Sequence, residues 1–432
     1  MRLEVKPIRL SAPRLSLKIG FNTPVHKRST EFALLIAVFL DMVGFTMLIP
    51  DIQLRAETML FGFAFKGPII GALLQSTFLV QLFASPRWGR LADNTGRKRV
   101  FVICQWLSAI AMLIYGFEGS ILLLFCSRIM AGFGGANVSV AQAMAAVAAG
   151  EDRKRVLAWV SATLSAGMIF GPAVGGFLAH QYGSQMIGIV GAIISFAGGA
   201  VVLLLVPTDK GESMPDGSDG VSQKYPLFDL TLFKSYPNLL PFFWIAVTAS
   251  FALATLEGTF GRLIHAMLGF GPREFGIIFS YEALLGIFVS VVVLSWIGKR
   301  LCDTTILRLG YIFQGIGLGI NPLAGVLTGF AHGMVWLLLA STMFSFGSGV
   351  VGPTLSTLAS NTVPENVQGE LFGVMQAART VGFIIGPILG GFLFDLWNPG
   401  PYVFAAAVCL VVAVALPAIC ACHTKPIDAQ PG

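Results

Sequence analysis

Five ionisable side chains lie well inside long apolar stretches of the sequence: Asp41, Arg128, Glu257, Glu282 and Arg379. A charged group inside a bilayer is costly unless it pairs with another group or faces water, so such residues mark proton relays, ion pathways or substrate sites. The chemistry predicted by these residue types is proton carriage or charge recognition within a membrane.

The position of each residue along its stretch indicates possible partners. At about 1.5 Å per residue, Asp41 and Arg128 both lie near the middle of the bilayer, and a pair is possible if their side chains point inward. Glu257 and Glu282 lie at a common level, so we expect their carboxyls to influence each other's protonation. Arg379 could pair with Glu282 or bind an anion. Three roles stay open for these residues: ion pairs that only hold helices together, proton carriage by one of the three acids, and recognition of a cationic substrate.

The apolar stretches that must position these residues are long enough to cross a bilayer. Of 432 residues, 55% are hydrophobic and 12% are charged, whereas about 25% are charged in a soluble domain. This composition excludes a soluble globular enzyme, leaves no room for an ATP-driven motor, and lacks the alternating pattern of an outer-membrane barrel. At about 20 residues per span, we predict twelve transmembrane helices. They begin near Glu31, Gly67, Val100, Gly119, Val156, Gln185, Leu239, Glu274, Thr304, Ala331, Gln368 and Pro401.

An internal repeat divides the twelve spans into two halves. GMIFGPAVGGFL begins at Gly167, and GFIIGPILGGFL begins 215 residues later, at Gly382. A repeat that keeps helix order at half the chain length predicts two related six-helix bundles. Glycines four residues apart share one helix face, on which backbones can approach closely, and the prolines bend the helix. We interpret these packing faces as the surfaces where the bundles rock against each other. The motif residues are Gly167, Gly171, Pro172, Gly175 and Gly176 in the first copy and Gly382, Gly386, Pro387, Gly390 and Gly391 in the second.

Polar segments delimit the predicted domains. We expect a basic cytoplasmic tail at 1–30, an N-terminal six-helix bundle at 31–206, a cytoplasmic linker at 207–238, a C-terminal bundle at 239–422 and a cytoplasmic tail at 423–432. The basic N-terminal tail could instead be an organellar transit peptide, which is the less favoured interpretation.

Lysine and arginine predict the orientation of the spans. One side collects the basic tail, the linker and most basic loops, whereas the other side holds only Arg55, Lys66, Arg262 and Arg273. By the positive-inside rule, both termini are cytoplasmic and the chain is a multi-pass protein of the plasma (inner) membrane.

The loop after the second span, GRLADNTGRKR, combines glycines with one acid and several bases. Its residues that could make specific contacts are Gly89, Asp93, Gly96, Arg97 and Lys98. Gly89 can sit against a neighbouring helix, Asp93 can cap a helix N-terminus, and Arg97 can seek a carboxylate on the same side. An ordinary basic loop is the alternative.

Several motifs resemble those of the major facilitator superfamily. GRLADNTGRK resembles its signature between spans 2 and 3, although Asn94 stands where arginine is usual, and LFCSRIMAGFGGA (124–136) is similar to its span 4 motif. The repeated GxxxGPxxGG of span 5 looks like the motif of its proton-coupled antiporters. FLDMVGFTMLIP (39–50) and LEGTFGRLIHAMLGFGP (256–272) resemble spans 1 and 7 of its twelve-span drug:proton antiporters, the group that contains the tetracycline exporters.

The resemblance implies an all-α polytopic fold of twelve transmembrane helices in two six-helix bundles. It also implies a secondary active transporter that works by alternating access and exports small lipophilic or cationic molecules, or drugs, in exchange for protons. In one closed state Asp93 would contact span 11, and Arg97 would tie the loop to span 4. A proton symporter or uniporter for a nutrient is the alternative, and a non-transporting scaffold or an intramembrane enzyme is less favoured. No protease, hydrolase or nucleotide-binding motif supports an enzyme.

Other polar residues within the spans are candidates to line a substrate cavity: Gln75, Asn137, Gln142 and Gln376, together with Arg379. A polar group in a span often only bonds a neighbouring helix. The 35 phenylalanines would suit a site for bulky, lipophilic cations. We expect membrane lipid, a small-molecule substrate and protons as partners, function as a monomer, and no nucleic acid, cofactor or metal ion.

Overall fold

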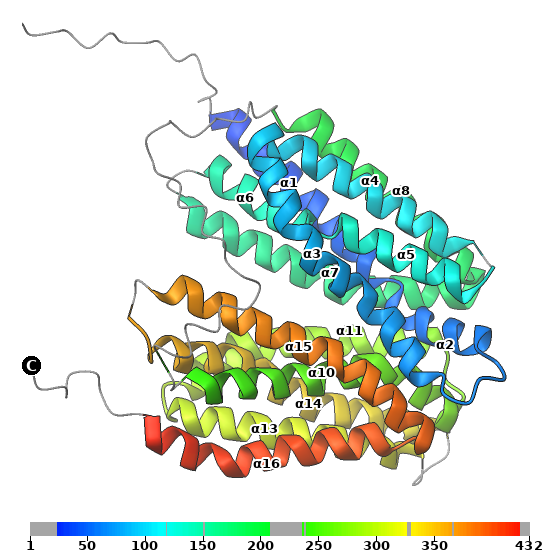
Figure 1. Cartoon of the computed structure of the whole chain (residues 1–432), viewed down its shortest axis with the longest axis vertical. Coiled ribbons are helices and arrows are strands. Elements are labelled where there is room, and N and C mark those ends of the chain that lie inside the picture. The colour runs from blue at the N-terminus through cyan, green and yellow to red at the C-terminus, as the bar shows by residue number, and fades with distance from the viewer. Residues whose placement is uncertain are drawn as a thin grey trace, which may run out of the picture.

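The chain forms an all-α structure, shown as a computed structural model in Figure 1. The structure describes residues 24–117, 119–149, 152–207, 236, 239–325, 330–364 and 367–423. These residues form helices and no strand, which confirms the predicted fold class. Residues 24–30 of the expected N-terminal tail belong to α1, and His423 of the expected C-terminal tail ends α16. The rest of both tails and most of the expected linker lie outside the described residues.

The helices follow the predicted spans, and one begins within three residues of each predicted start except the first, where α1 begins at Pro24, seven residues before Glu31. Ten helical stretches are long and apolar enough to cross a membrane, and α16 is apolar over Gly400–Leu416. The remaining span is α13 with the short helix η3. The helices are α1 (Pro24–Thr46), α2 (Ile49–Met59), α3 (Gly67–Thr95), α4 (Arg97–Gly116), α5 (Ile121–Gly134), α6 (Asn137–Ala149), α7 (Arg153–Tyr182), α8 (Ser184–Leu205), α10 (Leu239–Leu268), α11 (Pro272–Phe288), η2 (Val289–Val293), α12 (Leu294–Ile297), α13 (Asp303–Ile320), η3 (Asn321–Gly325), α14 (Phe330–Ser360), α15 (Gln368–Leu396) and α16 (Gly400–His423).

Three of the spans are interrupted. α1 and α2 form one span that breaks at Met47 and Leu48, because Pro50 lies in the first turn of α2 and has no N–H to continue the helix. α5 and α6 form another, which breaks after Gly134 and places Asn137 at the start of α6. A π-helical turn, η2, separates α11 from α12 in the eighth span.

The helices form two sets, α1 to α8 and α10 to α16, and each has its own apolar core. Figure 1 shows the sets meeting near α2 and lying further apart at the other end. We call the first the α2 end, at which α3, α8 and α11 begin, and the second the opposite end, at which α1, α4, α7 and α10 begin.

At the α2 end, α3 and α15 touch backbone to backbone. A Cβ added at Gly67 would lie 1.9 Å from the carbonyl oxygen of Gly391, and one added at Gly391 would lie 2.2 Å from that of Gly67. One turn further, a Cβ added at Gly71 would lie 2.3 Å from the Pro387 carbonyl oxygen. Only glycine allows helices to approach so closely.

A second crossing joins α7 to α11. A Cβ added at Gly176 would lie 2.4 Å from the carbonyl oxygen of Pro272, and one added at Gly276 would lie 2.2 Å from that of Pro172. The two copies of the repeated motif therefore supply one side of each crossing between the sets.

The glycines spaced four apart in the motif face their own set. Gly167, Gly171 and Gly175 lie against Met42, Thr46 and Met47 at the end of the first span. In the same way, Gly382, Gly386 and Gly390 lie against α10. The structure therefore differs from the expectation that these faces lie between the bundles. The contact between the sets is made instead by the neighbouring Gly176 and Gly391 and by the two proline turns.

At the opposite end, the two helices of the first crossing have separated. Among the residues that the structure describes, a Cβ added at Gly89 of α3 or at Gly373 of α15 would have no neighbouring atom within 4 Å. The expectation that Gly89 sits against a neighbouring helix is therefore wrong in this conformation. The two sets are apart where Gly89 lies. Gly89 and Asp93 belong to the last turns of α3, and only Gly96, with φ of 99°, separates α3 from α4. The side chain of Asp93 lies outside the described part of the structure.

The first crossing predicts that Gly391→Leu opens the α2 end. A leucine cannot fit against Gly67, so α3 and α15 should move toward the interaxial distance of about 8 to 10 Å that larger side chains impose. Spin labels at the exposed Phe61 and Trp397, in a chain whose six cysteines are replaced, would report the change by pulsed electron paramagnetic resonance. We call this separation the Phe61–Trp397 distance.

Gly373→Leu is the matched control, because it adds the same side chain to the same helix where space is open. It should leave the Phe61–Trp397 distance short. A short distance in both variants would show that the glycine crossing does not govern closure of the α2 end.

Candidate functional site

Asp41 lies in a polar cluster that joins three spans of the first set. Asn137 of α6 donates from Nδ2 to Asp41 Oδ1 of α1 at 3.0 Å. The same Asn137 Nδ2 donates to Gln105 Oε1 of α4 at 2.7 Å. Asn137 is buried, whereas Asp41 is only half-buried. An acid predicted to carry protons is thus held by amide groups and not by a cation.

Arg128 lies at another level and has an aromatic partner. It is 2% exposed, its Cζ lies 5.4 Å from the ring centroid of Tyr115, and its Nη2 is buried without a hydrogen-bond partner. Arg128 precedes Asn137 by nine residues in the same span, which corresponds to about 13 Å along the helix axis. The structure therefore does not form the Asp41–Arg128 pair that the sequence allowed.

Tyr115 connects Arg128 to an acid near the α2 end that sequence reasoning missed. Its hydroxyl donates to Asp51 Oδ2 at 2.5 Å, and Ser184 donates to Asp51 Oδ1 at 2.9 Å. Arg55 also packs against Tyr115, with its Cζ 4.8 Å from the ring centroid. A signal for Asp51 was available, because it precedes Arg55 by one helical turn directly after the motif of the first span.

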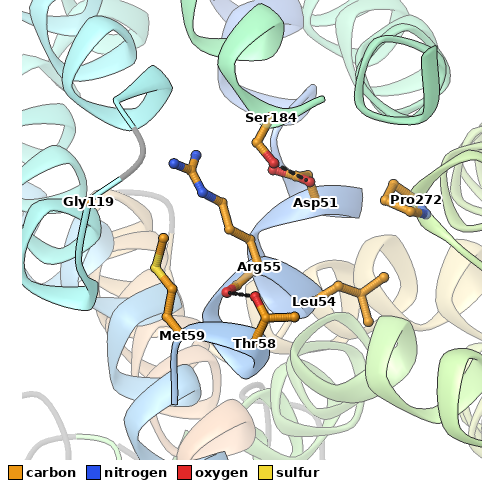
Figure 2. A pocket seen from close by; sticks show the side chains of 8 residues that line it. All are labelled: Asp51, Leu54, Arg55, Thr58, Met59, Gly119, Ser184 and Pro272. Carbon is orange, nitrogen blue, oxygen red and sulfur yellow. Dashed lines mark hydrogen bonds between the residues drawn. The ribbon is translucent and has the colours of Figure 1, made fainter. Parts of the chain in front are cut away.

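The Asp51 cluster borders a cavity of about 530 Å³ at the α2 end (Figure 2). Figure 2 shows Asp51 and Ser184 on one wall and Pro272, from the second set, across from them. The cavity therefore lies where the two sets meet. Its lining residues are Asp51, Leu54, Arg55, Thr58, Met59, Gly119, Ser184 and Pro272.

Glu257 of α10 and Glu282 of α11 lie near enough to interact electrostatically. The carboxylate of Glu282 accepts a hydrogen bond from Ser341, and its Oε2 is buried without a hydrogen-bond partner. Glu257 is half-buried. Neither acid takes part in an ion pair with any residue that the structure describes. The structure thus brings together two of the acids that the sequence placed at a common level.

Arg379 is not the partner of Glu282. Its Nη2 donates to Ser356 Oγ of α14 at 3.1 Å. Among the described residues, Arg379 and Glu282 form no ion pair with each other.

Arg262 of α10 joins the two sets through a network that the sequence did not predict. It is 3% exposed and donates from Nη2 to Asp395 Oδ1 of α15 at 2.7 Å. It also donates from Nε to Glu57 Oε2 of α2, in the first set, at 3.3 Å. Asp395 Oδ2 in turn accepts from the backbone N–H of Gly67, at the start of α3, at 2.6 Å. Charged side chains and a helix N-terminus thus hold the α2 end closed beside the first crossing.

The cavity candidates lie in different surroundings. Gln75 is buried, with an unpartnered Oε1, Gln142 is half-buried and Gln376 is exposed. Phe78, three residues after Gln75 on α3, contacts Phe45 of α1 and, across the two sets, Phe383 of α15, with ring centroids 5.9 and 6.0 Å apart.

Two sets of membrane-spanning helices that meet at one end, part at the other and enclose carboxylates define the architecture of a membrane transporter. A family model described as the Major Facilitator Superfamily matches residues 34–382 and 315–427. The chain belongs to the Major Facilitator Superfamily.

Curated relatives match over almost the whole chain. Multidrug resistance protein 1 of Bacillus subtilis (strain 168) is 27% identical over 394 residues, which are 90% of this chain and 96% of that protein. Quinolone resistance protein NorA of Staphylococcus aureus (strain Mu50 / ATCC 700699) is 22% identical over 388 residues, 89% of this chain and 94% of that protein.

Solved structures share the fold at low identity. The nucleoside transporter NupG gives a TM-score of 0.71 at 18% identity, covering 90% of this chain and 98% of that chain. The peptide transporter POT in complex with sulfate gives a TM-score of 0.70 at 14% identity, covering 91% and 94%.

The Arg262 network predicts that Arg262→Gln weakens closure of the α2 end. Removing one partner of a buried ion pair leaves the other charge uncompensated, and the closed arrangement should lose about 3 kcal/mol. The Phe61–Trp397 distance should lengthen in most molecules. Arg273→Gln, which changes an exposed arginine at the same end, should keep the short distance. Equal distances in the two variants would contradict a holding role for Arg262.

Proposed function

We propose that this transporter exports small lipophilic or cationic molecules, or drugs, in exchange for protons. The observation that carries the proposal is the Glu257 and Glu282 pair, two interacting carboxylates inside the spans without a cationic partner among the described residues. Curated relatives named for multidrug and quinolone resistance support the same activity.

The conformation supports alternating access. The sets touch at the α2 end and are apart at the opposite end, and the reverse arrangement would expose the other side. We propose that the moving units are the bundles at 31–206 and 239–422, and that both termini lie on the cytoplasmic side of the plasma membrane. The opposite end would then face the cytoplasm, and this conformation would be the one that takes up a substrate for export.

Protons would drive the change by neutralising an acid. Two nearby carboxylates repel each other when both are charged, so a proton bound by either Glu257 or Glu282 relieves the repulsion. Neutralising a carboxylate also lowers the cost of moving it through an apolar environment. Asp41 is the third candidate, and its hydrogen bond from Asn137 links any change in its charge to three spans of the first set.

Aromatic and amide groups between the sets favour a lipophilic or cationic substrate. Phe78 and Phe383 belong to different sets and their rings are in contact, and the unpartnered Gln75 oxygen lies one turn from Phe78. Aromatic faces attract cations and apolar groups alike. We propose that a substrate binds beside these rings, within one chain, and that the transporter works as a monomer in the lipid bilayer.

The test is a proton flux that depends on substrate. Purified protein in liposomes with a trapped pH indicator would receive ethidium or a quinolone, and added compound should start proton movement against the direction of drug movement. Each candidate acid is neutralised in turn by Glu257→Gln, Glu282→Gln or Asp41→Asn. The variant that removes the proton-carrying acid should move drug under a pH gradient no faster than without a gradient.

Glu370→Gln is the control, because Glu370 is an exposed acid in the first turn of α15. It should keep the full coupled rate. Full coupled rates in all three single variants and in the triple variant would contradict proton coupling by these acids. Drug movement that ignores the pH gradient would indicate a uniporter, and co-directional movement a symporter.

A further inference from the structure

Gln53 of α2 reaches across from the first set into the backbone of α10. Its Nε2 donates a short hydrogen bond to the carbonyl oxygen of Glu257, and its Oε1 accepts from the N–H of Gly261 at 3.0 Å. Gln53 is fully buried, with 0% of its surface exposed. One amide therefore bonds two backbone groups of the other set.

The two groups that Gln53 bonds are partners within an α-helix. In regular helical geometry, the N–H of residue 261 donates to the carbonyl of residue 257, four positions earlier. α10 is α-helical without interruption over Leu239–Leu268, so the Gln53 amide adds hydrogen bonds to this turn from outside the helix. Gln53 thus acts on the turn of α10 that begins at Glu257, the candidate proton carrier.

Gly261 makes room for this contact. A Cβ added there would lie 2.8 Å from the ring of Phe275 and 3.0 Å from Gln53 Oε1. Any larger residue would press on both neighbours, so the absence of a side chain at this position permits the amide to approach the backbone.

The Gln53 contact is one of several contacts between α2 and α10. Glu57 follows Gln53 by four residues, so the two side chains share one face of α2. Glu57 accepts a hydrogen bond from Arg262, the residue directly after Gly261. Both contacts join the two sets, and neither can persist when the sets part at the α2 end.

We propose that Gln53 is a positioning residue that couples closure of the α2 end to Glu257. When the sets meet, the Gln53 amide bonds the Glu257 carbonyl and the Gly261 N–H, and when they part both hydrogen bonds break. The turn that carries Glu257 is therefore held by α2 only in the closed state, and in the open state the Glu257 carboxylate is free to move relative to Glu282.

Linkage makes this coupling reciprocal. If closure alters the surroundings of Glu257, then a change in the charge of Glu257 must shift the closure equilibrium by the same factor. This inference rests on the proposed role of Glu257 in proton carriage.

The described helices around Glu257 carry other charged and titratable groups. They are Glu282 of α11, Arg262 with its partners Glu57 of α2 and Asp395 of α15, and Tyr402 of α16, whose hydroxyl contacts Thr259.

The experiment measures how the Phe61–Trp397 distance responds to pH in the full-length protein. In the otherwise unsubstituted protein, the ratio of closed to open molecules should change from acidic to alkaline pH. Gln53→Leu keeps a side chain of similar size but loses both hydrogen bonds, and it should lose most of this pH response, because it removes the contact through which closure acts on the turn of Glu257. Gln314→Leu is the matched control, since Gln314 is a buried glutamine of α13 within the second set, and it should keep the full pH response.

Gly261→Ala tests the same contact from the α10 side. Alanine favours the helix, so the variant should fold even if Gln53→Leu does not, and its methyl group would displace the Gln53 amide. We expect the same weakened pH response as for Gln53→Leu. A full response in Gly261→Ala would overturn the proposal.

Glu257→Gln separates this inference from the function on which it rests. If Glu257→Gln abolishes the pH response and Gln53→Leu weakens it, both proposals are supported. If Glu257→Gln abolishes the response while Gln53→Leu behaves like Gln314→Leu, Glu257 keeps its role and the positioning role of Gln53 is wrong. If Glu257→Gln keeps the response, the proposed proton carriage by Glu257 is wrong, and the coupling through Gln53 fails with it.

Discussion

The contact between the two helix sets depends on the absence of side chains at a few positions. Where α3 meets α15, Gly67 and Gly391 allow two backbones to touch, and Gly176 and Gly276 allow the same for α7 and α11. Because the helices approach so closely, short polar side chains can reach from one set to the other. The hydrogen bond from the Gly67 N–H to Asp395 exists only because the start of α3 lies directly against α15.

The charges inside the spans fall into two kinds. Arg262 is surrounded by Glu57 and Asp395, which compensate its charge and place it in the contact between the sets. The carboxylates of Glu257 and Glu282 interact with each other, and that of Glu282 accepts a hydrogen bond from Ser341, but neither has a cation among the residues that the structure describes. A compensated charge stabilises one conformation, whereas an uncompensated acid can change its charge at moderate cost. In the proposed mechanism, the first kind of residue holds a state and the second kind drives a change of state.

Local sequence explained the helices well and the contacts between them less well. The spans, their number and their division at the repeat were predictable because long apolar runs and a repeated motif are local signals. The ionisable residues inside the spans were also visible in the sequence. Asp51, Gln53, Glu57 and Asp395 were not singled out, because they lie near span ends, where polar residues are ordinary. Arg128 and Arg379 were identified as candidates, but their partners, Tyr115 and Ser356, depend on depth and on the direction in which each side chain points.

The sequence by itself determined that this protein crosses a membrane twelve times in two related halves and carries acids within its spans. These properties follow from composition and order along one chain, because the bilayer imposes the same length and polarity on every span. Only the tertiary structure decided which end is closed, that Asn137 and not Arg128 bonds Asp41, and that Gln53 reaches the turn of Glu257. These contacts join residues far apart in sequence across a glycine-lined approach, and each depends on helix rotation and separation that no local pattern specifies.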